Sequence, residues 1–243
     1  MTNNHFTILI TSYICGKWVK KNLNSALNQD YDNYEVIYVD DNSQDNTWEI
    51  VSSYKDDKLR SFKNSFNKGK MENMYYHINQ SKDNTIIVIL DGDDWLANNK
   101  VLETLNKAYN NNNIWITNGS YMIDPIGQTV KPIITESYWK DNIRKKSWQF
   151  SHLGTFKKEL FTKIKKKHLM NKRGEFWATT SDQAIMWPMV EMAGPEHHSV
   201  IDEVLYIYNR HNPLSDDRVN RKDQLDTEST IRSFPPYKRI ESL

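Results

Sequence analysis

The feature that most constrains the fold is the run TIIVIL over residues 85–90, which ends directly in the acidic sequence Asp-Gly-Asp-Asp. Two similar runs, FTILIT over residues 6–11 and YEVIYV over residues 34–39, also end in polar clusters. Strands without a regular alternation of apolar and polar residues are buried on both faces, as in a parallel sheet that helices cover. The three runs therefore predict an α/β fold with a mostly parallel sheet.

Helical segments are expected between these strands, because apolar residues recur there with a helical period. In chain order we expect a helix over 17–29, a helix capped by Asp45 or Asn46 and ending near 54, a weaker strand over 59–62, a helix over 71–80, a helix over 100–109, and a strand over 114–117. Strand and helix thus alternate through the first half, as in folds whose helices flank the sheet.

The second half of the chain is less regular. We expect a hairpin over 121–132, a strand over 149–155, a helix beginning near 157, a helix over 182–192 kinked at Pro188, and a strand over 204–208. The tail after His211 is polar, and Pro235-Pro236 indicates irregular chain. No Gly/Ser linker or repeat divides the chain, so a single domain is predicted.

Composition narrows the function. The 32 basic and 31 acidic side chains nearly cancel, which makes a nucleic-acid partner improbable, since such proteins usually carry a basic excess. The chain has one cysteine, Cys15, and no long apolar run, so we expect no internal disulfide and no transmembrane segment. The polar start, residues 1–5, is unlike a signal peptide, and a reducing, cytoplasmic location is expected.

The acidic cluster Asp91, Asp93 and Asp94 is the sharpest chemical signal. In open α/β sheets, ligands bind beyond the carboxyl ends of the strands, where this cluster lies. Three carboxylates on one tight turn repel one another unless a cation compensates, and oxygen ligands suit Mg²⁺ or Mn²⁺. The alternative is an ordinary Asp/Gly-rich turn after a strand.

Other strand ends carry weaker signals. Asp40 and Asp41 follow the second strand, where a carboxylate could accept a hydrogen bond from a nucleobase imide or merely belong to a strand–helix loop. No Gly-x-Gly-x-x-Gly turn follows the first strand of this chain, so a dinucleotide-binding fold is disfavoured. Gly69-Lys70 is followed by Met71 rather than Ser or Thr, so it does not form a P-loop.

Together these motifs resemble glycosyltransferase family 2, whose members have the GT-A fold. The resemblance rests on their order and spacing: Thr11-Ser12-Tyr13, Val39-Asp40-Asp41-Asn42-Ser43, Asn67-Lys68-Gly69, Leu90-Asp91-Gly92-Asp93-Asp94-Trp95-Leu96, and more loosely Ser181-Asp182 and His211. It implies a nucleotide-sugar-binding half (1–118), an acceptor-side half (119–211) and a C-terminal tail (212–243).

The resemblance also implies roles for individual residues. The nucleotide sugar would be bound by Thr11, Ser12, Tyr13, Asp40, Asn67, Lys70, Asp91 and Gly92. Among these, Asp40 would hydrogen-bond the edge of the uracil base, and Asp91 would contact the ribose or the sugar. Asp93, in the Asp-x-Asp motif, and His211 would hold the metal or diphosphate, and Asp182 would be the catalytic base. Asp182 or Ser181 could instead cap a helix, and His211 could be a surface histidine. Trp177 would either stack against the acceptor sugar or pack in the core.

The function that this resemblance implies is inverting, Mn²⁺- or Mg²⁺-dependent transfer of a sugar from a UDP-sugar to a hydroxyl acceptor such as a glycan. The chain lacks the Gln-x-x-Arg-Trp signature and membrane helices of the processive polymerases, so it would add one sugar per encounter. A nucleotidyltransferase and a non-catalytic nucleotide-sugar-binding module remain alternatives. The basic stretch 157–173 is either a solvated helix face or a contact for an anionic acceptor or membrane surface. The sequence does not give the oligomeric state of the protein.

Overall fold

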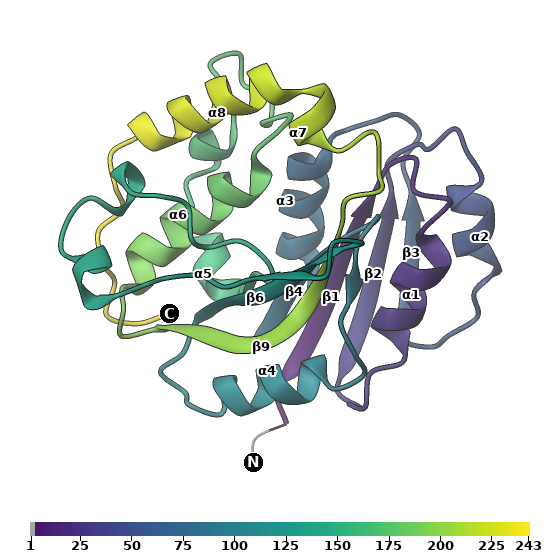
Figure 1. The fold of residues 1–243 in the computed structure, drawn as a ribbon, viewed down its shortest axis with the longest axis horizontal. Coiled ribbons are helices and arrows are strands. Elements are labelled where there is room, and N and C mark those ends of the chain that lie inside the picture. The colour runs from purple at the N-terminus through teal and green to yellow at the C-terminus, as the bar shows by residue number, and fades with distance from the viewer. Residues whose placement is uncertain (1–2) are drawn as a thin grey trace.

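The computed structural model describes residues 3–243, apart from the side chains of Asp216 and Asp217. One mixed sheet runs through the molecule in the order β3-β2-β1-β4-β8-β6-β9-β5 (Figure 1). Its first four strands are parallel: β3 (Leu59–Lys63), β2 (Tyr34–Asp40), β1 (His5–Ser12) and β4 (Thr85–Asp91). The buried strands β1, β2 and β4 are the three apolar runs, so the predicted α/β fold is confirmed.

The second part of the sheet mixes directions. The short strand β8 (Thr155–Lys157) lies antiparallel to β4 and β6 (Ile116–Asp124), whereas β6 and β9 (His198–Asn209) are parallel. Two shorter strands, β7 (Gln128–Val130) and β5 (Trp95–Leu96), pair antiparallel with β6 and β9. The long β9 curves across the molecule and ends beside the carboxyl ends of β1 and β4 (Figure 1).

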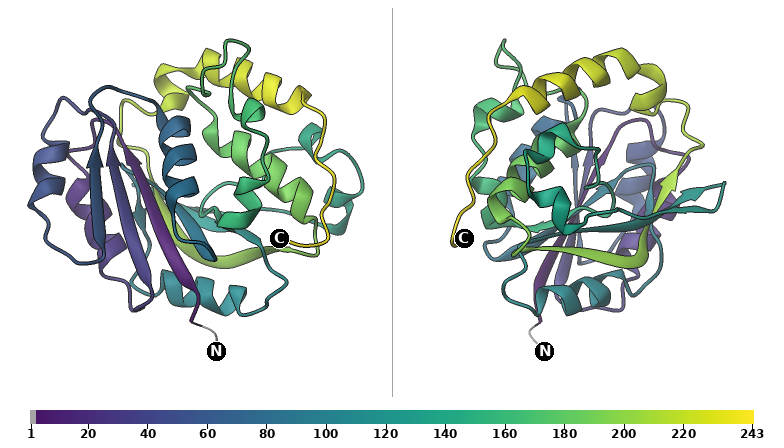
Figure 2. Two further views of the ribbon diagram at one scale, coloured as in Figure 1. Left: turned by 180° about the vertical axis from the view of Figure 1, so that it is seen from behind. Right: turned by 60° about the vertical axis from the view of Figure 1, so that its left-hand side comes forward.

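Helices cover both faces of the sheet and bury two separate apolar clusters. The helices α1 (Val19–Leu27), α2 (Thr47–Ser53) and α4 (Val101–Tyr109) pack on one face. The helices α3 (Lys70–Gln80), α5 (Lys158–Thr162) and α6 (Ser181–Ala193) pack on the other (Figure 2). Short 3₁₀ turns occupy Glu136–Trp139, Ile143–Lys145 and Lys166–Leu169. Within residues 3–243, none of the helices combines the length and hydropathy that crossing a bilayer requires.

The C-terminal segment departs from prediction. No helix was expected in the tail after His211, but it forms α7 (Asp216–Val219) and α8 (Arg221–Ser233), and α8 lies over α6 (Figures 1 and 2). The chain at Pro235-Pro236 is irregular, as expected. The polar sequence of α8 hid it, because Ile231 is its one buried residue. Tertiary contacts, rather than an apolar stripe, hold such a helix in place.

Three further expectations need correction. Residues 149–154 are irregular rather than a strand, and strand pairing begins only at Thr155 in β8. The carbonyl of Gln149 accepts a hydrogen bond from the Asn118 side chain (2.8 Å). Strand β9 begins at His198 rather than at residue 204, since its pairing with β6 starts there. The predicted helix over 182–192 is confirmed as α6 and continues through Pro188, but its cap position is Thr180.

Candidate active site

The candidate active site is a cleft of about 610 Å³ at the carboxyl ends of β1 and β4. Register places Thr11 beside Asp91 and Ser12 beside Asp40, so three strand ends meet at one edge of the sheet. Of the sequence-predicted residues, the cleft brings together Thr11, Ser12, Tyr13, Lys70, Asp91, Gly92, Asp93 and Asp182. It is also lined by Asp41, the second member of the predicted Asp40-Asp41 pair, and by residues that were not predicted, among them Asn73, His152, Tyr208, Asn212 and Gln224.

The acidic loop after β4 packs tightly against the end of β1. A Cβ atom on Gly92 would lie 2.6 Å from Cβ of Ser12, so only glycine fits this approach. On the other side, Nδ2 of Asn22 donates to the carbonyls of Asp91 (2.9 Å) and Asp94 (2.8 Å). Asn22 is fully buried in α1, and it thus fixes both ends of the loop.

Asp91 forms an ion pair across the cleft. Its Oδ1 lies 2.5 Å from Nζ of Lys70, at the first position of α3. Burial would raise the pKa of Asp91, but the ammonium group of Lys70 outweighs it and holds that pKa below its usual range. Asp91 is therefore an ionised carboxylate whose charge is already largely matched within the protein.

Asp93 differs from its neighbour, because no cation of the protein pairs with it among the described residues. Its Oδ2 accepts a hydrogen bond from Nδ2 of Asn212 at 2.7 Å. Burial and the nearby charge of Asp91 raise the pKa of Asp93. A divalent cation would relieve this repulsion, so the carboxylate has the chemistry of a metal ligand.

Asp94 is not available as a ligand, which corrects the expectation that all three carboxylates hold the cation. It is 1% exposed, and its carboxylate accepts hydrogen bonds from the Tyr206 hydroxyl and the Asn209 backbone N–H (2.7 Å). Burial, followed by the charges of Asp93 and Asp91, raises its pKa well above the usual range. Asp94 therefore anchors the acidic loop to β9.

The described residues contain no group of three or more histidine, cysteine or acidic side chains arranged to hold a metal ion. A cation at Asp93 would therefore take further oxygen ligands from a bound substrate and from water. Mg²⁺ and Mn²⁺ sites that act on diphosphates are commonly of this kind, with one or two carboxylates from the protein.

Asp182 lies in the first turn of α6 and faces both the cleft and a small cavity of about 30 Å³ beside it. Burial raises the pKa of Asp182, although Lys70 partly opposes this. Backbone N–H groups of the first turn, including that of Gln183, interact with the carboxylate and favour its ionised form, so Asp182 can contribute to the helix start and still face the cleft.

His152 enters the site from the irregular segment before β8 and lines both cavities. Its ring stacks on Tyr206 at a centroid distance of 4.3 Å and on Tyr208 at 5.4 Å. Burial lowers the pKa of His152 to about 4, so the ring is neutral at pH 7. Nothing in its local sequence indicated this role, because the segment has no motif and no helical or strand period.

Two predicted donor-site residues do not line the cleft. Asp40 is fully buried; its Oδ1 accepts from the Ser43 backbone N–H (3.3 Å), while no described group hydrogen-bonds Oδ2. Asn67 is exposed outside the cleft. Asp41 lines it instead, and its carboxylate accepts from the backbone N–H groups of Lys68 (2.9 Å) and Gly69 (2.8 Å). Asp41 thereby fixes the loop that places Lys70 in the cleft.

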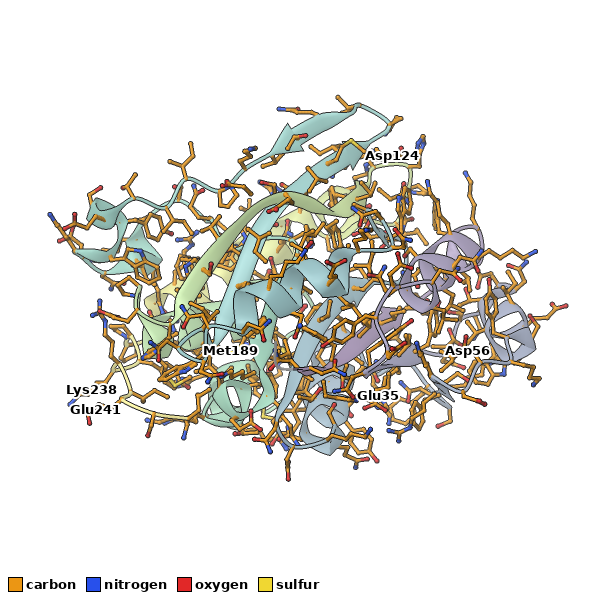
Figure 3. The ribbon with its side chains drawn as sticks, turned by 90° about the horizontal axis from the view of Figure 1, so that it is seen from below. Glu35, Asp56, Asp124, Met189, Lys238 and Glu241 are labelled. Carbon is orange, nitrogen blue, oxygen red and sulfur yellow. The ribbon has the colours of Figure 1, made fainter. Side chains whose placement is uncertain are left out.

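His211 and Trp177 also lie outside the cleft lining. Nε2 of His211 lies 3.3 Å from Oδ2 of Asp124, which Figure 3 labels near the end of β6, so the next residue, Asn212, takes the position beside Asp93. Trp177 is 9% exposed, belongs to the core cluster under α6, and donates from its indole N–H to the His168 carbonyl (3.0 Å). These surroundings match the alternatives stated for both residues, a surface histidine and a core tryptophan.

Polar and acidic residues beyond the carboxyl ends of the parallel strands β1, β2 and β4 mark the place where open α/β proteins bind their ligands, so fold and site define a ligand-binding α/β protein. Comparison with known sequences narrows this class, since the sequence model described as "Glycosyl transferase family 2" matches residues 7–173. The chain belongs to glycosyl transferase family 2.

Curated relatives are similar over part of their length. Over 95 residues the chain is 34% identical to the UDP-Glc:alpha-D-GlcNAc-diphosphoundecaprenol beta-1,3-glucosyltransferase WfaP of Escherichia coli, covering 39% of this chain and 38% of that protein. Over 175 residues it is 29% identical to the GalNAc(5)-diNAcBac-PP-undecaprenol beta-1,3-glucosyltransferase of Campylobacter jejuni, covering 70% of this chain and 54% of that protein. The matched parts thus span about half or less of these relatives.

Solved structures support the GT-A fold. S. aureus TarS 1-349 in complex with UDP-GlcNAc aligns with a TM-score of 0.65 and 18% identity, covering 86% of this chain and 59% of that chain. The mannosyltransferase PcManGT from Pyrobaculum calidifontis, in complex with GDP-Man and Mn²⁺, aligns with a TM-score of 0.64 and 17% identity, covering 97% and 66%. The sheet flanked by helices matches these glycosyltransferase structures.

Proposed function

We propose that the protein is an inverting, metal-dependent glycosyltransferase that moves a sugar from a UDP-sugar to a hydroxyl group of an acceptor. The observation that carries this proposal is the meeting of three groups in one cleft: the carboxylate of Asp93, the ion pair of Lys70 with Asp91, and the carboxylate of Asp182. Family membership supports sugar transfer over the nucleotidyltransferase alternative.

The donor in this proposal is a UDP-sugar, whose nucleoside lies against Thr11, Ser12 and Tyr13. Two observations support a uracil base. Oδ2 of Asp40 is a buried acceptor without a described hydrogen-bond donor, and the N3–H of uracil is such a donor. The relative WfaP is named for UDP-Glc as its donor. Because Asp40 is covered, we propose that it binds the base only after the end of β1 adjusts.

In the proposed complex, Asp93 would hold a Mg²⁺ or Mn²⁺ ion, and Asn212 would orient the carboxylate through its 2.7 Å hydrogen bond. The cation would neutralise the charge that develops on the departing diphosphate. Lys70 adds a second positive charge on the same side of the cleft, and Asp41 keeps it there by fixing the Lys68–Gly69 loop.

The proposed chemical step is a single displacement. The carboxylate of Asp182 accepts the proton of the acceptor hydroxyl, and the oxygen attacks the anomeric carbon from the face opposite the diphosphate. The bond between that carbon and the diphosphate oxygen breaks, and its electron pair leaves with UDP. Configuration inverts because attack and departure occur on opposite faces.

The acceptor side is formed in this proposal by α6 and the segment 208–224, which supplies Tyr208, Asn212 and Gln224 to the cleft. The relatives WfaP and the C. jejuni enzyme are named for acceptors linked to undecaprenyl diphosphate. We therefore propose a glycan on a lipid-linked diphosphate as the acceptor class, in place of the Trp177 platform expected from the sequence.

The test is release of UDP from UDP-glucose, UDP-N-acetylglucosamine and UDP-galactose with Mn²⁺, with and without a synthetic polyprenyl-diphosphate sugar. We expect acceptor-dependent UDP release that Asp93→Asn abolishes, while Asp202→Asn, which changes an exposed carboxylate outside the cleft lining, leaves it intact. Pyrophosphate formation from UTP and a sugar phosphate would identify a nucleotidyltransferase. UDP-sugar binding without turnover for any acceptor would identify a binding module.

A further inference from the structure

The segment between α5 and α6 concentrates positive charge. Residues 163–173 read KIKKKHLMNKR and contain no acidic residue, although the whole chain carries a net charge of only +1. All six of its lysine and arginine side chains are exposed: Lys163, Lys165, Lys166, Lys167, Lys172 and Arg173. None of the six forms an ion pair with a described carboxylate. Their charges are therefore uncompensated at short range.

Aromatic rings adjoin this basic segment across the outer surface of α3. Nζ of Lys166 lies 5.2 Å from the ring centre of Tyr75 and 5.5 Å from that of Phe176. Beside Tyr75 on the same helix, Tyr76 is 52% exposed, and Lys68 lies 5.9 Å from its ring centre. We call the basic segment together with Phe66, Lys68, Tyr75, Tyr76 and Phe176 the lysine–aromatic face.

The lysine–aromatic face borders the cleft. Phe66 is 60% exposed and precedes Lys68, whose backbone N–H donates to Asp41 in the cleft wall (2.9 Å). Figure 2 (left) shows α3 on the outside of the molecule, with the green segments that follow α5 beside it. A flat partner that contacts this face would therefore lie next to the cleft entrance formed by the start of α3.

We propose that the lysine–aromatic face binds the surface of an anionic lipid bilayer. Lysine ammonium groups near such a surface are attracted by its negative potential, and each contributes separately. Aromatic side chains with exposed rings favour the headgroup region, where ring and polar groups are both satisfied. Nucleic-acid surfaces favour arginine, whereas five of the six basic side chains here are lysine.

Bilayer binding would bring a lipid-linked acceptor to the cleft, and this consequence rests on the proposed function. The surface itself does not depend on it, because the charges and rings stand outside the catalytic cleft. The experiment is therefore done without donor, metal or acceptor, so that failure of transfer and failure of bilayer binding are separate results.

The experiment is sedimentation of the protein with vesicles of phosphatidylcholine alone and of equal parts phosphatidylcholine and phosphatidylglycerol. We expect binding to the anionic vesicles only, weakened by added salt. The variant Lys165→Gln/Lys166→Gln/Lys167→Gln should bind roughly ten- to a hundredfold more weakly. The control Lys20→Gln/Lys55→Gln/Lys100→Gln removes three exposed lysines beside the helices of the opposite face and should bind like the wild type.

A second variant, Phe66→Ser/Tyr76→Ser, keeps every charge and should weaken binding roughly tenfold. Thermal unfolding of each variant confirms that the fold is retained. Equal loss in the test and control lysine variants would overturn the proposal, because binding would then follow net charge alone. Absence of wild-type binding to anionic vesicles, with or without affinity for a single-stranded RNA, would also overturn it.

Discussion

At the scale of single residues, the acidic loop shows that neighbouring carboxylates can have different tasks. Asp91 is paired with Lys70, Asp93 faces the cleft beside Asn212, and Asp94 is buried against Tyr206 and Asn209. Removing Asp93 should therefore affect ligand binding, whereas removing Asp94 should affect the position of the whole loop. The same residue type thus serves as ion-pair partner, candidate ligand and structural anchor within four positions.

The first prediction concerns Asp182. The Asp182→Asn variant should keep its affinity for UDP and lose turnover by roughly 10²–10⁴-fold, because an amide cannot accept the acceptor's proton. Calorimetry with UDP and steady-state kinetics measure the two quantities, with Asp202→Asn as the control. If UDP affinity collapses together with turnover, Asp182 is a binding or structural residue instead of the base.

The second prediction concerns pH. A buried carboxyl with a raised pKa stays protonated to higher pH, and only its ionised form accepts a proton. Activity should therefore rise with pH through a value above 3.8, the ordinary pKa of aspartate. Because Lys70 lowers the pKa of Asp182, Lys70→Met should move this acidic limb to still higher pH. A kcat/KM profile that falls only at or below pH 3.8 would contradict the assignment.

The sequence predicted those site residues whose positions follow from motifs at the ends of strands and helices. The acidic loop, Thr11-Ser12-Tyr13 and Asp182 were found because chain order places them at strand and helix ends that converge. His211 and the pair Asp40-Asp41 were found too, but Asn212 was missed, because a motif does not encode which of two neighbouring side chains turns inward. His152 was missed because stacking on Tyr206 and Tyr208, from a distant strand, holds it in the site.

At the scale of elements, a buried ion pair holds the C-terminal segment in place. Arg144, 1% exposed, donates two hydrogen bonds to the Glu191 carboxylate (2.6 and 2.8 Å) and a third to the carbonyl of Ile231 in α8 (2.7 Å). Glu191 also accepts from the Tyr237 backbone N–H (2.9 Å). The pair thus joins α6, the segment before β8 and the end of α8.

The third prediction tests this pair. Arg144→Met should lower the free energy of unfolding by roughly 3–5 kcal/mol, because it leaves the Glu191 carboxylate buried without its partner. Urea unfolding measures the loss, and Lys145→Met, at the exposed neighbouring position, is the control. The double variant Arg144→Met/Glu191→Leu should regain much of the stability, since it removes both charges. A double variant no more stable than the single one would show that the hydrogen bonds of the pair to the backbone of Ile231 and Tyr237 dominate over the pairing of the two charges.

Elements of the first half were predictable because each carries its own pattern of apolar residues. The strands β1, β2 and β4 are apolar throughout, and α1, α3 and α4 bury regular stripes. By contrast, α8 and the first residues of β9 are held by contacts with α6 and β6 that lie far away in sequence. Local patterns cannot reveal such elements, because tertiary contacts rather than local preference stabilise them.

At the scale of the whole molecule, donor and cation should stabilise the fold only together. The fourth prediction is that UDP with Mn²⁺, at about a hundred times its Kd, raises the Tm by roughly 5–10 °C. A chelator should remove this shift, and Asp93→Asn should not show it, whereas Asp202→Asn should. Differential scanning fluorimetry measures it. An equal shift for UDP without any divalent ion would mean that the protein binds the donor independently of metal.

Because the chain is synthesised from its N-terminus, Asp94 is made long before the residues of β9 that anchor it. Its partner Tyr206 lies 112 positions further along the chain, and Asn209 lies 115 positions further. The parallel strands β1, β2 and β4 can pair on a growing chain long before β9 exists, since domains acquire structure progressively during translation. The acidic loop gains its anchor only when β9 has been made. A chain that stops short of β9 would thus carry a formed half-sheet with an unfinished cleft, so the cleft is completed only after β9 has been made.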